Sequence, residues 1–213
     1  MDTNTPTRTR REPELTFSSK ELFDLALAWV TLSVAFALFI EPVHSGEADI
    51  QHFVLMVGLS FITVGVAFLL HELAHKIVAI EHGQIAEFRA DYQMLFLAIM
   101  IALLGFLFAA PGAVYHRGQI TKRENAMVAL AGPVTNHLLA LMFLPLLIFP
   151  DPLRTIGAMG VTINLFLAAF NMIPFGPLDG KSVWNWNKGV CLLVFIPSLT
   201  LALLALVEIG LFG

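Results

Sequence analysis

The sequence predicts an all-α polytopic membrane protein with about five to six transmembrane helices and a re-entrant or short strand element at about 84–116. Two observations support this fold class. Of the 213 residues, 57% are hydrophobic and 13% are charged, whereas about a quarter of the residues in soluble domains are charged. The apolar residues also form runs without amphipathic periodicity, and these runs approach the ~20 residues that cross ~30 Å of hydrocarbon.

The first residues and the apolar runs divide the chain into a tail and one membrane domain. Residues 1–20 mix Pro, Thr and both charge signs, and they hold too few apolar side chains to fold alone. We therefore expect a disordered cytoplasmic tail at 1–20 and a single intramembrane domain at 21–213. The apolar runs of this domain occupy residues 22–40, 53–80, 126–149, 156–174 and 190–212, with a borderline run at 94–110.

Composition also limits the partners and the kind of site. The net charge is −4, and the basic residues form no stripe with interleaved aromatic residues. Nucleic acid is therefore not an expected partner, whereas the lipid bilayer is. Cys191 is the one cysteine in the sequence, which excludes an internal disulfide and a cysteine-based zinc site.

Basic residues predict the orientation in the membrane. Arg8, Arg10, Arg11 and Lys20 precede the first apolar run, whereas the loop at 41–52 has no Lys or Arg. Because cytoplasmic flanks are enriched in these residues, we expect a multi-pass protein of the cell membrane with its N-terminus in the cytoplasm. The second run then returns inward, so that its last residues lie near the cytoplasmic side.

The second run ends in the motif HELAH, which predicts a metal site. His71 and His75 are four residues apart, so on a helix they project from one face and can bind the same ion. Glu72 is next to the first histidine, where it can serve as the base for a metal-bound water. Ionisable side chains at membrane depth are costly and usually functional.

A catalytic zinc typically has three protein ligands and an open position, so a third ligand is expected. Asp179 is the best candidate, because it follows a segment broken by prolines and glycines at 171–178. Irregular backbone at membrane depth is tolerated where protein or a water-filled cavity satisfies it. His137 lies in an apolar run and is the alternative ligand, although such a residue is more typical of a helix–helix contact. The remaining histidines are poor candidates, namely His44, His52, His82 and His116.

Three segments together resemble the site-2 protease family of intramembrane zinc metalloproteases. They are HELAH (71–75), AGPVTN (131–136) and NMIPFGPLDG (171–180), and the resemblance extends over about residues 53–185. It implies one zinc per chain bound by His71, His75 and Asp179, with Glu72 as the catalytic base and with Asn136 and Asn171 orienting the substrate or stabilising the oxyanion. Ala74 and Lys181 stand where many members have glycine, which removes neither a ligand nor the base. The chain is similar to a minimal member without a PDZ or CBS domain.

The resemblance implies hydrolysis of a peptide bond in or near a transmembrane segment of a membrane-protein substrate. The orientation predicted from the basic residues places the opening of the active site on the cytoplasmic side. A zinc transporter or sensor and a catalytically idle membrane scaffold are the alternative functions. Transport calls for a series of ligands across the membrane, and residues 54–70 supply none. The substrate helix must unwind locally, because its carbonyls are otherwise engaged in hydrogen bonds. An exposed strand edge could hold it, and residues 84–92 are the candidate for such a strand.

Residues 94–116 are predicted to enter the membrane from the cytoplasmic side and to return without crossing. If they crossed, the basic residues at 117–123 would lie outside, against the usual bias. The next two spans would then place Asp179 on the side opposite His71, and no single zinc could join them.

Glycines and prolines mark where the backbone changes course or meets another element. Gly105 and the Pro-Gly pair at 111–112 allow a short helix to give way to an extended strand at 106–118. The alternating residues 84–92 are expected to form a second short strand. Gly132 is expected to allow close approach of helices, because small residues let backbones meet in lipid.

Overall fold

The computed structural model describes residues 14–41, 49–107 and 110–209. The α-helices are α1 (Ser19–Ile40), α2 (Ile50–Ser60), α3 (Val66–Glu81), α4 (Tyr92–Leu103), α5 (Lys122–Phe143), α6 (Leu153–Asn171), α7 (Asp179–Trp186) and α8 (Lys188–Glu208). The strands are β1 (Ile85–Ala90) and β2 (Gly112–Arg117). A π-helical segment, Phe61–Gly65, joins α2 to α3, and a 3-10 segment, Leu144–Ile148, follows α5.

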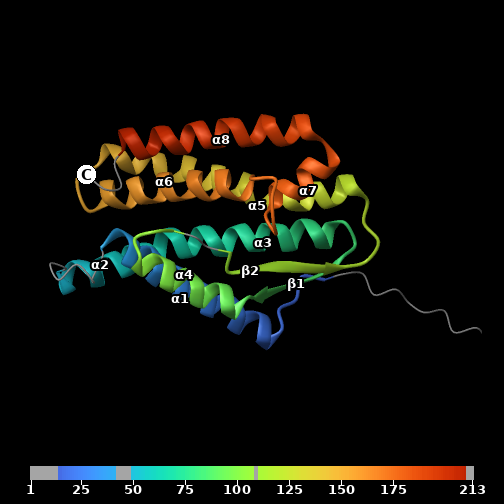
Figure 1. Ribbon diagram of the computed structural model, residues 1–213, viewed down its shortest axis with the longest axis horizontal. Helices are drawn as coiled ribbons and strands as arrows, with labels where there is room; N and C mark the ends of the chain where they lie inside the picture. The colour runs from blue at the N-terminus through green and yellow to red at the C-terminus, as the bar shows by residue number, and fades with distance from the viewer. Residues whose placement is uncertain (1–13, 42–48, 108–109, 210–213) are drawn as a thin grey trace, which may run out of the picture.

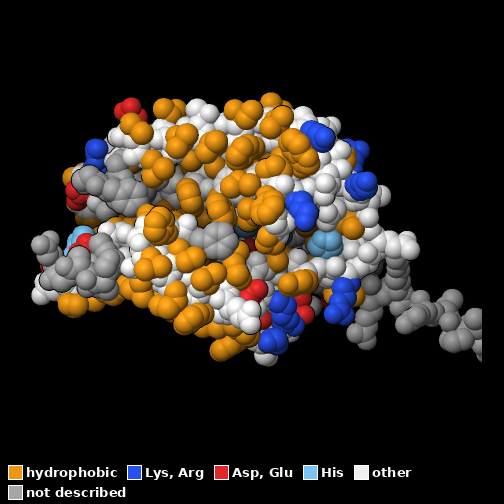
Figure 2. All heavy atoms as spheres, viewed as in Figure 1, with side chains coloured by type: hydrophobic (Ala, Val, Ile, Leu, Met, Phe, Trp, Pro, Cys, Tyr) orange, Lys and Arg blue, Asp and Glu red, His pale blue; other side chains and the backbone are white. Residues whose placement is uncertain are grey.

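Five helical segments in the described residues are long and apolar enough to cross a membrane. They are Ser19–Ile40, Ile50–Glu81, Lys122–Ile148, Leu153–Asn171 and Lys188–Glu208. Figure 1 shows α3 in the middle, with α5, α6 and α8 on one side and with α1, α4 and the two strands on the other. Hydrophobic side chains cover much of the flank in Figure 2. The predicted all-α polytopic fold is confirmed.

Helix starts lie a few residues before the apolar runs, because polar side chains cap the first turns. Ser18 accepts a hydrogen bond from the amide of Glu21 at the start of α1. Thr121 and Glu124 form a reciprocal capping box at the start of α5. Such caps satisfy amides that the helix itself leaves unpaired, and hydropathy alone does not register them.

β1 and β2 form an antiparallel hairpin around α4. Ala90 pairs with Gly112 and Ile85 with Arg117, so the chain leaves β1, passes through α4 and returns beside its point of departure. The 12 residues of α4 span about 18 Å, which is short of the ~30 Å of hydrocarbon. This geometry confirms the predicted short strand element, and it is consistent with a segment that returns without crossing. The strands are shorter than the expected 84–92 and 106–118, and residues 108–109 of the latter lie outside the described residues.

The N-terminal residues that the structure describes pack against the domain. α1 begins at Ser19, inside the range expected to be a tail, and the carbonyl of Thr16 accepts a hydrogen bond from Lys76 at 2.6 Å. Residues 1–13 of that expected tail, and most of the loop at 41–52, lie outside the described residues.

The π segment packs closely against α1. The indole Nε1 of Trp29 donates a hydrogen bond to the carbonyl of Phe61 at 3.0 Å. Gly65 is packed against the same indole, so closely that a Cβ at this position would overlap its atoms. The wide turn presents a backbone carbonyl to a partner, and it fixes the second span against α1 six to ten residues before His71.

Candidate metal centre

The structure brings together His71 and His75 of α3 with Asp179, the first residue of α7. The two Nε2 atoms are 2.9 Å apart, and each lies 3.3 Å from Oδ2 of Asp179. In a tetrahedral zinc site with bonds of ~2.0–2.1 Å, neighbouring ligand atoms are about 3.3 Å apart. The three side chains thus have the spacing of a zinc ligand set, as the sequence predicted for these residues.

An irregular segment after α6 places Asp179 at α3. α6 ends at Asn171, and α7 begins only at Asp179. Within this segment Gly176 has a φ of 62°, a left-handed conformation that glycine adopts without steric cost. Gly180 lies against the carbonyl of Met172, where a Cβ would overlap the oxygen. The segment therefore turns back on the end of α6 and aims the first side chain of α7 at the histidines.

Hydrogen bonds to Nδ1 orient both imidazoles. Nδ1 of His75 donates to the carbonyl of Val128 at 2.7 Å, and Nδ1 of His71 donates to Oδ1 of Asn136 at 2.6 Å. A carbonyl oxygen can only accept, so the proton of His75 is on Nδ1 and the lone pair of Nε2 faces the site. Such partners fix the tautomer and raise the basicity of a metal-binding histidine.

The tautomer of His71 follows from a chain of amides that ends at a backbone carbonyl. Asn164 Nδ2 donates to the carbonyl of Gly160 at 2.8 Å, so its Oδ1 is the acceptor for Asn136 Nδ2 at 2.9 Å. This leaves Oδ1 of Asn136 as the acceptor for His71. Asn164, in an apolar run, is a contributor that the sequence analysis did not identify.

Two observations show that this donor set fits a cation. The Nε2 lone pairs of His71 and His75 and the carboxylate of Asp179 all converge, and Oδ2 of Asp179 is buried without a hydrogen-bond donor among the described residues. Three convergent acceptors without a donor are stabilised by a bound metal ion.

Gly132 of α5 makes room for the imidazoles. A Cβ at Gly132 would lie 2.5 Å from Nε2 of both His71 and His75. The close approach expected at this glycine is therefore present, and the group that it admits is the pair of metal ligands.

A cavity of about 200 Å³ adjoins the cluster. His71, Glu72, His75 and Asp179 line it, and Oε2 of Glu72 is buried without a hydrogen-bond partner among the described residues. The rest of the wall includes Leu32, Phe68, Gly112, Ala113, Val114, His116, Asn125, Val128, Leu167, Asn171, Pro177 and Ser182. The predicted base thus lies beside the metal ligands, and β2 forms one wall of the cavity.

The two asparagines expected near a substrate occupy different places. Asn171 lines the cavity, and its Nδ2 donates to the carbonyl of Leu167 at 3.1 Å. Asn136 is fully buried, and its amide is engaged by His71 and Asn164. Asn136 therefore lies behind a metal ligand, because helix α5 packs its side chain against α3 and α6.

Two other histidines, His137 and His116, lie in different surroundings. His137, the alternative third ligand, contacts Ser198 of α8 through Nε2 at 3.0 Å and the carbonyl of Pro133 through Nδ1 at 2.8 Å. It forms a helix–helix contact, apart from the metal cluster. His116, a poor candidate for a ligand by its sequence position, lies in β2 and lines the cavity.

The chain is similar to known proteins over most of its length. A Methanocaldococcus jannaschii protein with the provisional name zinc metalloprotease MJ0611 is 41% identical over 186 residues, which cover 85% of this chain and 92% of that protein. A Bacillus subtilis protein with the provisional name zinc metalloprotease YwhC is 32% identical over 143 residues, which cover 57% of this chain and 65% of that protein. No family model and no solved structure matches the chain.

The extent of the first similarity agrees with the metal cluster found independently in the fold. Because the 41% identity spans nearly all of the Methanocaldococcus protein, and because His71, His75 and Asp179 converge as a zinc ligand set, the chain belongs to this family of zinc metalloproteases.

Proposed function

We propose that the protein is an intramembrane metalloprotease of the site-2 protease type, which hydrolyses a peptide bond in or near a transmembrane segment of another membrane protein. The observation that carries this proposal is the location of the site. His71, Glu72 and His75 lie within Ile50–Glu81, one of the helices long and apolar enough to cross a membrane. A hydrolytic site built into such a helix favours a substrate that is itself embedded in the bilayer.

The residues around the site have separable roles in this reaction. One zinc held by the three ligands would polarise the scissile carbonyl and lower the pKa of water. Glu72 accepts the proton of the attacking water and delivers it to the leaving amine nitrogen. Its unpartnered Oε2 supports this role, because the oxygen is free to accept. The Nδ1 atoms of His71 and His75 are engaged by Asn136 and Val128, so their Nε2 atoms are available to bind zinc.

The hairpin supports a binding mode for an unwound substrate. β2 pairs with β1 on one edge, and its residues Gly112, Val114 and His116 line the metal cavity. An extended segment beside the second edge of β2 would find backbone partners there. Its scissile carbonyl would then lie near His71, Glu72 and Asp179, in a site of limited access to water.

The charge distribution supports the proposed orientation in the cell membrane. Figure 2 shows the Lys and Arg side chains of the visible face mostly at the end of the molecule where β1, β2 and α7 lie, with hydrophobic side chains along the flank. Basic residues favour the cytoplasmic side. The metal cavity would then open toward the cytoplasm, on the same side as the N-terminus.

The proposal is tested with detergent-purified protein and a transmembrane reporter. Cleavage should require zinc, and Glu72→Gln should reduce kcat by about 10²–10⁴-fold while zinc stays bound, because the imidazoles are unchanged. Glu81→Gln, an exposed carboxylate on the same helix, is the control and should leave the rate unchanged. Cleavage by Glu72→Gln at the normal rate would contradict the proposal. Zinc flux in proteoliposomes without cleavage would favour a transporter, and the absence of both would favour a scaffold.

A further inference from the structure

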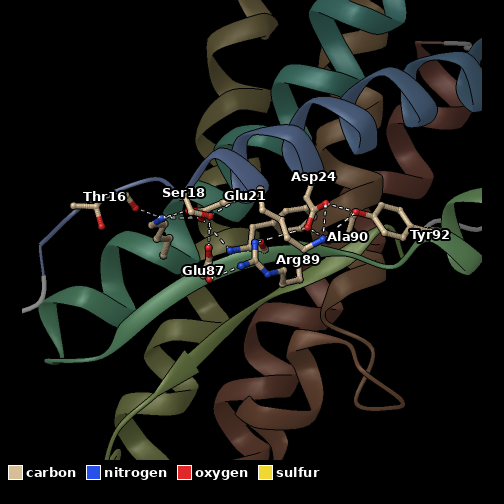
Figure 3. Close-up of polar contacts among 11 residues, drawn as sticks. Thr16, Ser18, Glu21, Asp24, Glu87, Arg89, Ala90 and Tyr92 are labelled. Carbon is tan, nitrogen blue, oxygen red and sulfur yellow. Dashed lines mark hydrogen bonds and ion pairs between the residues drawn. The ribbon is translucent and has the colours of Figure 1, made fainter.

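A second set of buried charges contains none of the metal ligands. Glu21 and Asp24 of α1 are each 1% exposed, and Lys76 of α3 is 2% exposed. Charged side chains are seldom fully buried unless they are paired. Figure 3 shows Glu21 and Asp24 facing the backbone of β1. These residues therefore connect three elements that are distant in the sequence.

Lys76 is fully engaged by its neighbours. Its Nζ donates to Oε1 and Oε2 of Glu21 at 2.7 and 2.6 Å and to the carbonyl of Thr16 at 2.6 Å. An ammonium group has three donors, so these bonds use all of them. The ring of Phe17 covers the ammonium at 4.0 Å. Lys76 thus holds Glu21 in place and compensates its charge.

The two carboxylates accept hydrogen bonds from the backbone of β1. The amide of Phe88 donates to Oε1 of Glu21 at 3.0 Å, and the amide of Ala90 donates to Oδ2 of Asp24 at 3.4 Å. Residues two apart in a strand present their amides on the same edge. Because β2 occupies the other edge, the α1 carboxylates stand where the carbonyls of a further strand would be, and β1 is closed to an added strand.

The same register leaves the outer edge of β2 open toward the cavity. Phe88 pairs with Val114, and since the amide of Phe88 points away from β2, this is a pair without ladder hydrogen bonds. The backbone groups of Val114 then point outward, and within the described ranges no hydrogen bond satisfies them. Val114 also lines the metal cavity.

We propose that Glu21, held by Lys76, and Asp24, which accepts a hydrogen bond from the hydroxyl of Tyr92 at 2.5 Å, are positioning residues that fix β1 and thereby hold the open edge of β2 beside the metal cavity. An extended substrate backbone is then directed to β2, because the edge of β1 is already occupied. This inference rests on the proposed proteolytic function and extends it to how the substrate strand is placed.

The positioning role predicts a specific kinetic effect. Without the α1 acceptors, the hairpin would occupy its binding-competent position for only a fraction of the time. The apparent affinity for substrate falls by that same fraction, whereas the bound complex reacts normally. KM should therefore rise while kcat and zinc content stay the same.

A matched pair of double variants isolates the acceptor from the ion pair. Glu21→Gln/Lys76→Met and Glu21→Leu/Lys76→Met both remove the two charges together, which avoids an unpaired buried ion. Only the glutamine offers a carbonyl oxygen to the amide of Phe88. We expect KM within about twofold of the unmodified protein for the first variant and about tenfold higher for the second, the factor that corresponds to one buried hydrogen bond.

Hydrogen exchange provides a readout that does not need cleavage. The amides of β1 and β2 should exchange faster in Glu21→Leu/Lys76→Met than in Glu21→Gln/Lys76→Met, because only the former loses the edge acceptor. Equal KM and equal exchange in the two variants would overturn the inference, and so would a shared loss of zinc or kcat, which indicates general structural damage. If the unmodified protein cleaves no transmembrane reporter, the proposed function and the substrate part of the inference fail, while the exchange comparison still decides whether the carboxylates hold the hairpin.

Discussion

At the residue scale, Asn164 touches no metal ligand, and yet it sets which nitrogen of His71 faces the metal. The carbonyl of Gly160 orients the amide of Asn164 by a hydrogen bond. The amide of Asn164 in turn orients Asn136, which orients His71. Each link has one donor and one acceptor, so the tautomer at the end of the chain is determined by a backbone carbonyl at its beginning.

Removal of the Asn164 amide should weaken zinc binding, although Asn164 is not itself a ligand. Asn164→Leu leaves Asn136 Nδ2 with only its longer hydrogen bond to the carbonyl of Ala67 at 3.5 Å, so that Asn136 is held less firmly. We expect a loss of zinc affinity of about 10–100-fold, the range for partners of metal-binding histidines. A competition titration with a zinc chelator measures it. Ser198→Ala, which removes a comparable polar contact between α5 and α8, should keep the normal affinity. Unchanged zinc affinity in Asn164→Leu would show that Asn136 is oriented by other means.

Gly132 is a second residue that affects the metal ligands without binding the metal, because its lack of a side chain leaves room for them. Gly132→Ala introduces a methyl group 2.5 Å from the Nε2 atoms, so the imidazoles must move, and we expect loss of both zinc and activity. Gly58→Ala is the matched control, because nothing lies within 4 Å of the added Cβ, and it should bind one zinc per chain. Metal content by elemental analysis distinguishes the two. Normal zinc in Gly132→Ala would contradict the packing described at this position.

The residues that the sequence identifies and those that it misses differ in kind. His71, His75 and Asp179 could be predicted because their chemistry is rare in an apolar chain and their spacing or surroundings are distinctive. The carbonyl of Val128 could not, since every residue has one. Asn164 could not either, because an asparagine in an apolar run also forms ordinary helix contacts. Residues that orient the ligands, such as Val128 and Asn164, are determined by which helices pack together, and the sequence alone does not show this packing.

At the element scale, the hairpin and α4 form one unit that starts and ends at the same place. The alternation of residues and the Pro-Gly pair at 111–112 predicted both strands, whereas their lengths follow from capping. Asp91 accepts hydrogen bonds from the amides of Gln93 and Met94, and this cap ends β1 and begins α4. Periodicity alone does not reveal such a change, since apolar and polar residues go on alternating from Ala90 to Met94.

Because the unit of β1, α4 and β2 returns to its starting point, its two ends should lie on the same side of the membrane. Single cysteines at Ile85 and Arg117, in a Cys191→Ser background of proven activity, should be labelled by a membrane-impermeant reagent from the same side of sealed vesicles. A cysteine at Arg154, at the start of α6, should be labelled from the other side. Labelling of positions 85 and 117 from opposite sides would contradict the pairing of β1 with β2.

At the scale of the whole molecule, the metal ligands join two groups of helices. α3 supplies His71 and His75 beside the hairpin, and Asp179 comes from α7, which packs with α5 and α8. Three acceptors that face one another without a cation are unfavourable. The ion is thus expected to stabilise the arrangement of α7 against α3 as well as to serve the reaction.

Removal of zinc should therefore lower the thermal stability of the protein in detergent. Stripping by a chelator is expected to reduce Tm, and readdition of zinc should restore it, because a ligand that binds only the folded state stabilises it. Glu72→Gln keeps the three ligands and should show the same zinc-dependent shift. Asp179→Ala should show a much smaller one. An equal shift in Asp179→Ala would mean that another residue supplies the third ligand.

The π segment at Phe61–Gly65 determines where the second span tolerates a change of length. A π turn bonds residues five apart, whereas an α turn bonds residues four apart, so this turn holds one residue in excess. Deleting a residue within it can close the turn to ordinary helix and leave His71 in phase with the outer half. Deleting Ala67 instead offers no such slack, and it would rotate the outer half by about 100° relative to His71. Natural insertions and deletions in this helix are therefore expected to gather at the π segment, several residues before the first metal ligand.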